Sequence, residues 1–94
     1  MPIKSFADKH TEKLWLGHRT KILPANLIKR AENKLAILNA AVRLEDCDIP
    51  PGNKLEALKG DRKGQYSIRI NQQWRICFRW DNGDVHDVEI VDYH

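Results

Sequence analysis

Apolar residues recur at helical spacing in the first half of the chain and at strand spacing in the second half. A short helix is predicted first, with Asp8 as its N-cap and Gly17 as its stop. A longer helix should begin at Pro24 or Asn26. Its apolar positions recur at steps of three and four, which is typical of an amphipathic helix lying on a sheet. This stripe, predicted to be core, consists of Leu27, Ile28, Ala31, Leu35, Leu38 and Val42.

Strict alternation of apolar and polar residues predicts strands in the second half. The inward positions of two successive runs are Tyr66, Ile68 and Ile70, then Trp74, Ile76, Phe78 and Trp80. The turn residues Asp81-Asn82-Gly83-Asp84 predict a hairpin into a last strand over about 85–91, with Val88 and Ile90 inward. A brief alternation from Ile3 to Phe6 predicts a short first strand. Leu55 and Leu58 are interpreted as short apolar anchors.

The predicted order is β-α-α-β-β-β, which indicates an α+β fold with two helices packed on one face of a mainly antiparallel sheet. At 94 residues the chain is long enough for one domain, 1–94, and no more. No apolar run approaches the length of a membrane span, and the N-terminus does not resemble a secretion signal. Cys47 and Cys77 are too few and too isolated for a disulfide framework or a zinc site. We therefore expect a cytoplasmic protein with no membrane association, metal or cofactor.

The net charge of +3 is unevenly distributed. Residues 54–79 hold seven basic and two acidic residues, whereas residues 81–94 hold five acidic residues and no lysine or arginine. Alternation places Arg69, Arg75 and Arg79 on the sheet face opposite the core, where guanidinium groups suit phosphate. A basic face of this kind indicates a polyanion partner. The alternative is a solvated face whose bases pair with neighbouring acids, and charge alone does not separate the two.

Three segments resemble the HigB-type toxins of the RelE/ParE superfamily, and the resemblance covers most of residues 50–94. They are Asn53-Lys54-Leu55-Glu56-Ala57-Leu58-Lys59-Gly60-Asp61-Arg62, Ser67-Ile68-Arg69-Ile70-Asn71-Gln72-Gln73-Trp74-Arg75-Ile76, and Val88-Glu89-Ile90-Val91-Asp92-Tyr93-His94. The resemblance implies a compact fold similar to RelE and the microbial ribonucleases. It also implies that the protein is the toxin of a type II toxin–antitoxin system, with a helix-turn-helix antitoxin (HigA-like) encoded nearby.

The resemblance further implies cleavage of mRNA at the ribosome, with operator DNA reached only through the antitoxin. Metal-free RNA cleavage needs a base for the 2′-hydroxyl, cationic groups for the phosphorane and a proton for the leaving 5′-oxygen. The implied catalytic residues are Lys59, Asp92, Tyr93 and His94, together with Glu56. The expected RNA- and phosphate-binding residues are Lys54, Arg62, Arg69, Arg75 and Arg79.

Glu56 departs from the family pattern, because HigB-type relatives that cleave RNA well can carry a histidine at this position. A glutamate can accept a proton, but it adds negative charge beside the phosphates and cannot act as a cationic acid. Two functions therefore stay open. One is a ribosome-dependent mRNA endoribonuclease. The other is a weakly catalytic or non-catalytic toxin that binds the ribosome or, as in the ParE branch, DNA gyrase.

Overall fold

The computed structural model describes residues 2–18 and 20–93. Its α-helices are α1 (Lys9–Trp15) and α2 (Ile28–Ala40), and its strands are β1 (Glu56–Ala57), β2 (Tyr66–Arg69), β3 (Trp74–Asp81) and β4 (Asp84–Asp92). Four 3-10 turns complete the elements: η1 (Ala25–Leu27), η2 (Leu44–Asp48), η3 (Pro51–Asn53) and η4 (Gly60–Arg62). Among the described residues, no helix is both long and apolar enough to span a bilayer.

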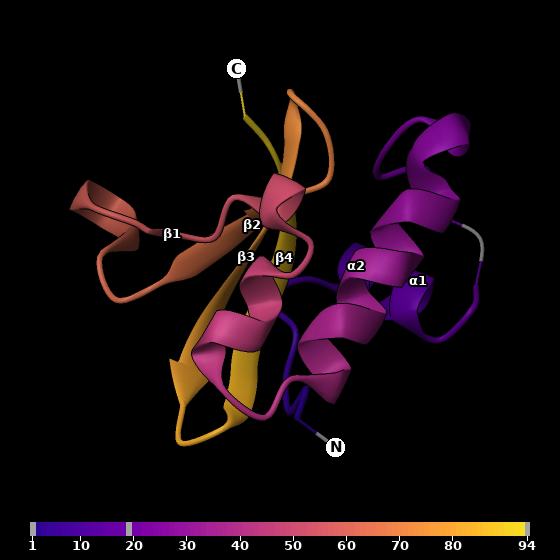
Figure 1. Ribbon diagram of the computed structural model, residues 1–94. Coiled ribbons are helices and arrows are strands. Elements are labelled where there is room, and N and C mark those ends of the chain that lie inside the picture. Colours follow the sequence, from indigo (N-terminus) through magenta and orange to yellow (C-terminus); the bar gives the residue numbers. More distant parts are fainter. Residues whose placement is uncertain (1, 19, 94) are drawn as a thin grey trace.

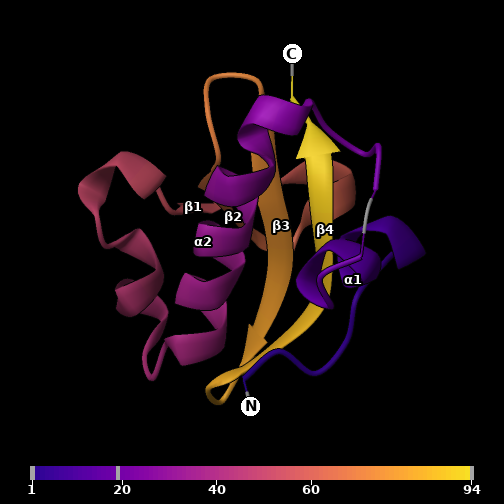
Figure 2. The same ribbon diagram turned by 90° about the vertical axis from the view of Figure 1, so that its right-hand side faces the viewer.

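The strands form one antiparallel sheet in the order β1-β2-β3-β4, and both helices lie on the same side of it (Figures 1 and 2). The predicted α+β class is confirmed. The core fills the space between the helices and the sheet, with Leu35 and Leu38 of α2 opposite Ile68, Ile76 and Phe78. We call the opposite surface of the sheet the open face. It carries Ser67 of β2, Arg75 and Cys77 of β3, and Glu89 of β4.

Helix α1 begins as predicted, since the Asp8 carboxylate accepts a hydrogen bond from the Thr11 amide at 2.7 Å. The stripe of α2 is confirmed at Leu27, Ala31, Leu35 and Leu38, and Ile28 is partly buried against the core. Val42 was wrongly assigned to this stripe.

The error at Val42 follows from where α2 ends. The helix stops at Ala40 and Ala41 is already extended, so the inward position passes to Ala41. Val42, beyond the helix, is 78% exposed.

The predicted hairpin joins β3 and β4, and Asn82 and Gly83 both have positive φ, as a type I′ turn requires. Beyond it, β4 contributes two residues, Asp87 and Val88, where β3 contributes only Phe78. Asp87 has a φ of 54°, so this is a β-bulge with its irregular residue at position 87. The three-residue step from Val85 to Val88, both fully buried, follows from this extra residue.

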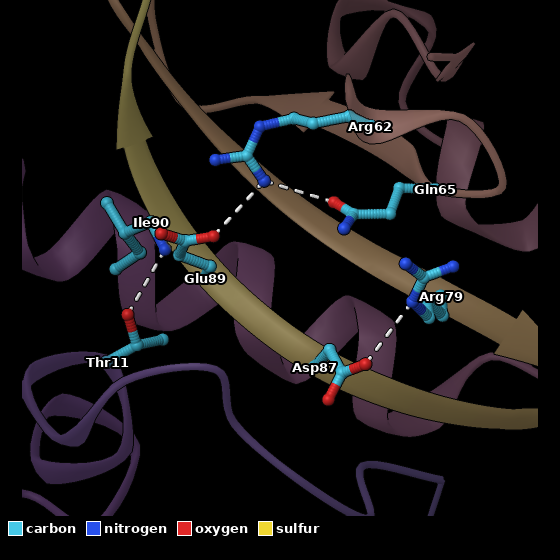
Figure 3. Close-up of polar contacts among 7 residues, drawn as sticks. All are labelled: Thr11, Arg62, Gln65, Arg79, Asp87, Glu89 and Ile90. Atoms are coloured by element: carbon cyan, nitrogen blue, oxygen red, sulfur yellow. Dashed lines mark hydrogen bonds and ion pairs between the residues drawn. The ribbon is translucent and has the colours of Figure 1, made fainter. Parts of the chain in front are cut away.

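The strand predicted from Ile3 to Phe6 is present only as two single parallel bridges, Ile3 to Val85 and Phe6 to Val88. The Lys4 amide donates to the Val85 carbonyl at 2.7 Å. Further along β4, the Ile90 amide donates to the Thr11 hydroxyl of α1 at 3.1 Å (Figure 3). The outer edge of β4 is therefore covered by the N-terminal segment and by α1.

Strand β1 was not predicted, because its two residues are both exposed and give no alternation to detect. Glu56 pairs with Ser67 and Ala57 with Tyr66. This short pairing brings the segment before Lys59 onto the sheet, next to β2.

Candidate functional site on the open face

Arg75 occupies the centre of the open face, and its side chain is only 7% exposed. Its Nε donates to the Ser67 hydroxyl at 2.8 Å, and its Nη2 donates to the Lys54 carbonyl at 2.8 Å. The guanidinium is thus held by β2 and by Lys54, two residues before β1. The prediction that Arg75 is an exposed phosphate ligand is wrong as to exposure, because neighbouring segments cover the side chain.

Two residues assigned to catalysis meet at Arg75. The Glu56 carboxylate lies 3.1 Å from Arg75 Nη2 and is 59% exposed. The Tyr93 ring, which belongs to the residue after β4, has its centroid 5.8 Å from the Arg75 guanidinium carbon, a cation–π contact. A carboxylate, a guanidinium and a phenol from three separate segments therefore come together at one place.

The segment before β1 is built to present the Lys54 carbonyl to Arg75. Lys54 has a φ of 49°, a left-handed conformation that follows the 3-10 turn η3. Asn53 beside it is fully buried and donates to the Cys47 carbonyl at 3.0 Å, while its amide oxygen accepts from Lys34 of α2. The Leu55 amide donates to Asp48 at 2.9 Å. Sequence reasoning missed Asn53, although a polar residue after Pro50-Pro51-Gly52 is a signal of a hydrogen-bonded turn.

A loop from residue 58 to residue 65, which we call the β1–β2 loop, contains η4 and carries Lys59 (Figure 1). Lys59 is exposed. From this loop Arg62 Nη1 reaches across the sheet and donates to Glu89 of β4 and to Gln65, both at 3.1 Å (Figure 3). Glu89 was not predicted as a site residue, and Arg62 forms an internal ion pair.

Arg79 lies toward the hairpin end of the open face, and its Nε is 3.3 Å from the carboxylate of Asp87. Arg62, Arg75 and Arg79 are thus each paired with an acid. The alternative interpretation of the charge pattern, bases paired with neighbouring acids, describes these three arginines. Arg69 differs from them, because it is half-buried and its Nε is buried without a hydrogen-bond partner among the described residues.

The C-terminal positions are only partly described. Asp92 pairs with Trp74 in the strand register and accepts a hydrogen bond from Gln73 Nε2 at 3.1 Å. Tyr93 follows it and is 38% exposed. His94, assigned to catalysis from the sequence, lies outside the described residues.

Cys77 lies on the open face, as its place in the alternation predicts, yet it is fully buried. Burial raises the pKa of the Cys77 thiol, although the nearby Arg62 and Arg75 act in the opposite direction. A thiol with a raised pKa is a poor nucleophile near neutral pH. Cys77 is therefore assigned no part in the chemistry.

The sequence of the chain is similar to that of known HigB toxins. A sequence model of the family described as "RelE-like toxin of type II toxin-antitoxin system HigB" matches residues 4–94. The chain is 40% identical over 79 residues to Toxin HigB-1 of Vibrio cholerae, a match covering 83% of each protein. It is 35% identical over 92 residues to Endoribonuclease HigB of Proteus vulgaris, covering 98% of this chain and 99% of that protein.

A solved structure supports the fold independently of close sequence similarity. A chain of the YoeB–YefM complex from Staphylococcus aureus superposes with a TM-score of 0.61 at 17% identity, covering all of this chain and 99% of that one. At this level of identity the likeness concerns the architecture of two helices on an antiparallel sheet.

Proposed function

Because the chain belongs to the HigB-like family of RelE-like toxins of type II toxin–antitoxin systems, we propose that it is an endoribonuclease that inhibits translation by cutting mRNA at the ribosome. The observation that carries the proposal is the meeting of Glu56, Arg75 and Tyr93 on the open face. These residues offer a carboxylate that can accept a proton, a fixed positive charge and an exposed aromatic ring.

The proposed reaction is an attack within the RNA itself. The 2′-oxygen forms a bond to the adjacent phosphorus, its proton passes to a base, and the bond from phosphorus to the 5′-oxygen breaks. The leaving 5′-oxygen takes up a proton, which leaves a 2′,3′-cyclic phosphate and a 5′-hydroxyl. General acid–base catalysis by positioned side chains accounts for about 10²–10⁴-fold of such a rate.

Glu56 is the proposed base, since its carboxylate is exposed and is oriented by its contact with Arg75. Arg75 provides positive charge near the phosphorane without being a flexible surface ligand, and preorganised charge of this kind stabilises a transition state. Tyr93 is proposed to stack on an RNA base or to donate a proton.

The remaining family positions complete the proposal. Lys59 is proposed to stabilise the phosphorane, and Lys54 and Arg69 to contact neighbouring phosphates. Asp92 and His94 are proposed to exchange protons beside Tyr93.

A second candidate is inhibition by occupancy of the ribosome, or of DNA gyrase, without efficient cutting. The Glu56–Arg75 ion pair favours it, because the charge of Arg75 is already balanced and the anion of Glu56 repels an approaching phosphate. Both candidates produce growth arrest, so growth alone does not separate them.

The test is cleavage of a defined mRNA on programmed ribosomes by the purified protein. We expect new 5′-hydroxyl ends from the wild type, a loss of at least tenfold in Glu56→Gln, and no change in Glu12→Gln. Glu12→Gln is the matched control, since it removes the same charge from α1 on the helical side of the sheet. An uncut mRNA together with inhibited translation would support occupancy of the ribosome. Inhibited DNA supercoiling with unaffected translation would support gyrase.

We further propose a cytoplasmic toxin whose partner is a HigA-like helix-turn-helix antitoxin. Co-expression with the product of the neighbouring reading frame should relieve growth arrest and give a complex that copurifies. If the neighbouring product neither binds nor relieves the arrest, this assignment of the partner is wrong.

A further inference from the structure

The β1–β2 loop lies on the open-face side of the sheet, opposite the helices (Figure 1). Arg62 of this loop reaches Glu89 on β4, and β4 is the third strand away from β1 (Figure 3). Neighbouring strands are about 4.8 Å apart, so β1 and β4 are separated by roughly 14 Å. An arginine side chain reaches across that width only from a loop that lies above β2 and β3.

Cys77 gives independent evidence of this cover. It lies directly opposite Glu89 in the β3–β4 register and is fully buried, but it is not part of the core between the helices and the sheet. Arg62, Glu89 and Arg75 are all close enough to influence its thiol electrostatically. The side chain of Cys77 is therefore shielded from the open-face side.

Arg79 provides a second contact to the same loop. A methyl group added at Gly64 would lie 3.0 Å from Arg79 Nη1, so the loop backbone passes directly beside this guanidinium. Arg79 is in turn paired with Asp87 at the bulge of β4. Inside the loop, the Leu58 amide donates to the Gln65 carbonyl at 2.9 Å, which closes the base of the loop.

We propose that Glu89 is a positioning residue that holds the β1–β2 loop over the open face by accepting the hydrogen bond of Arg62. The loop carries Lys59, so Glu89 acts on the chemistry through the placement of that lysine. In this assignment Arg62 serves the loop and is not a phosphate ligand. The catalytic consequence rests on the proposed endoribonuclease function, whereas the holding of the loop does not.

The two cysteines provide a built-in reporter for the loop. Cys77 lies beneath it, and Cys47 is fully buried in the core between α2 and the sheet. Alkylation rates of both thiols, followed in one sample by peptide mass spectrometry, therefore separate opening of the loop from unfolding of the whole domain. The variants are Glu89→Ala, Arg62→Ala, the double variant, and the exchanged pair Arg62→Glu with Glu89→Arg.

The ion pair is about one-third exposed on each side, at 30% and 32%, so the expected effects are modest. Each single alanine variant should speed labelling of Cys77 about two- to fivefold, with labelling of Cys47 unchanged. The double variant should be no faster than the faster single one, because both remove the same interaction. The exchanged pair should bring labelling back toward the wild-type rate. Unchanged labelling of Cys77 in Glu89→Ala would overturn the proposal, as would equal acceleration at Cys47.

RNA cleavage supplies a second readout with opposite expected signs. If Glu89 positions the loop, Glu89→Ala should lower kcat with little change in KM. If Arg62 instead binds phosphate, removing its internal competitor should tighten RNA binding and lower KM, and that result would overturn the proposal. Should Glu89→Ala fail to fold, Glu89→Gln, which retains a hydrogen-bond acceptor, is tested with the same two measurements against Arg62→Ala. Because labelling needs no RNA, an inactive wild type would refute the proposed function and leave the test of the loop intact.

Discussion

The Arg75 guanidinium and the Glu56 carboxylate form an ion pair whose two members lie in very different environments. They are 3.1 Å apart, yet the Arg75 side chain is 7% exposed and that of Glu56 is 59% exposed. Removing Arg75 leaves the buried Ser67 hydroxyl and the Lys54 carbonyl without their donor, whereas removing Glu56 leaves a guanidinium that keeps these two hydrogen bonds. Substitutions at the two positions should therefore affect stability very differently.

Arg75→Gln should lower the free energy of unfolding by about 1–3 kcal/mol, because the Ser67 hydroxyl and the Lys54 carbonyl lose their partner. Urea denaturation measures this loss. The matched control is Arg69→Gln on the neighbouring strand, which should cost less than about 1 kcal/mol since Arg69 Nε has no described partner to lose. Equal losses in the two variants would mean that the Arg75 contacts contribute nothing specific.

Glu56→His should raise RNA cleavage on programmed ribosomes near pH 7, because an imidazole exchanges protons in that range and removes a fixed anion from the phosphate path. The free energy of unfolding should change by less than about 1 kcal/mol, because Glu56 is exposed and Arg75 keeps its hydrogen bonds to Ser67 and Lys54. A histidine variant that cuts at the wild-type rate would place position 56 outside the chemistry.

Stability should fall at alkaline pH because of Cys47. Burial raises the pKa of the Cys47 thiol from 9.0 to about 11, and the nearby Asp46 acts in the same direction. Above pH 9 the unfolded chain releases this proton, while the folded protein retains it until about pH 11. The free energy of unfolding should therefore decrease across this window, by about 2–3 kcal/mol from this thiol. Denaturation of Cys47→Ala at pH 8 and pH 11 is the check. The variant loses core volume at both pH values, but its pH-dependent decrease should be smaller than that of the wild type.

Salt dependence should distinguish cations that contact RNA from cations used inside the molecule. Binding to a single-stranded RNA should weaken with salt, and each lost phosphate contact should reduce the slope of log K against log[salt] by about 0.7. We expect this reduction for Lys54→Gln and Lys59→Gln, which remove exposed charges. Arg79→Gln should leave the slope nearly unchanged, since Arg79 is paired with Asp87. Identical slopes in all three variants would argue against a difference between the two lysines, which are proposed to contact RNA, and Arg79, which is paired inside the molecule.

Two substitutions separate the contribution of the Tyr93 ring from that of the Tyr93 hydroxyl. Tyr93→Phe keeps an aromatic ring beside Arg75, whereas Tyr93→Leu should lose the stacking contribution, about 1–3 kcal/mol of RNA binding. Neither should change the melting temperature much, because the Tyr93 side chain is 38% exposed and is not part of the hydrophobic core. Binding that survives in both variants would exclude stacking. Cleavage lost in Tyr93→Phe while RNA binding is retained would assign the hydroxyl to proton transfer. Deletion of residues 93–94, or a C-terminal tag, should abolish growth arrest, whereas an N-terminal tag should not.

The sequence predicts the fold well where the signal is local. The stripe of α2 and the Asn82-Gly83 turn are properties of short segments, and both are confirmed apart from Val42 at the end of the stripe. Strand β1 is absent from the prediction because two exposed residues have no periodicity. They form a strand only through their antiparallel pairing with β2.

The site is less predictable, because alternation assigns a residue to a face but not to an environment. Arg75 and Arg79 are both correctly placed opposite the core, yet one is buried and the other is half-exposed. The difference arises from segments distant in sequence, such as the carbonyl of Lys54, 21 residues away. Glu89 was overlooked for the same reason, since its partner Arg62 is 27 residues distant along the chain.

The bulge at Asp87 changes the parity of β4. With one residue more than its partner strand, β4 turns Val85 toward the core on one side of the irregularity and Val88 and Ile90 toward it on the other. Val85 and Tyr93 are separated by an even number of positions along the chain. In a regular strand, whose side chains alternate between the two faces, both would therefore lie on the same face of the sheet. The single extra residue lets one strand anchor the hydrophobic interior at its start and still deliver Tyr93 to Arg75 at its end.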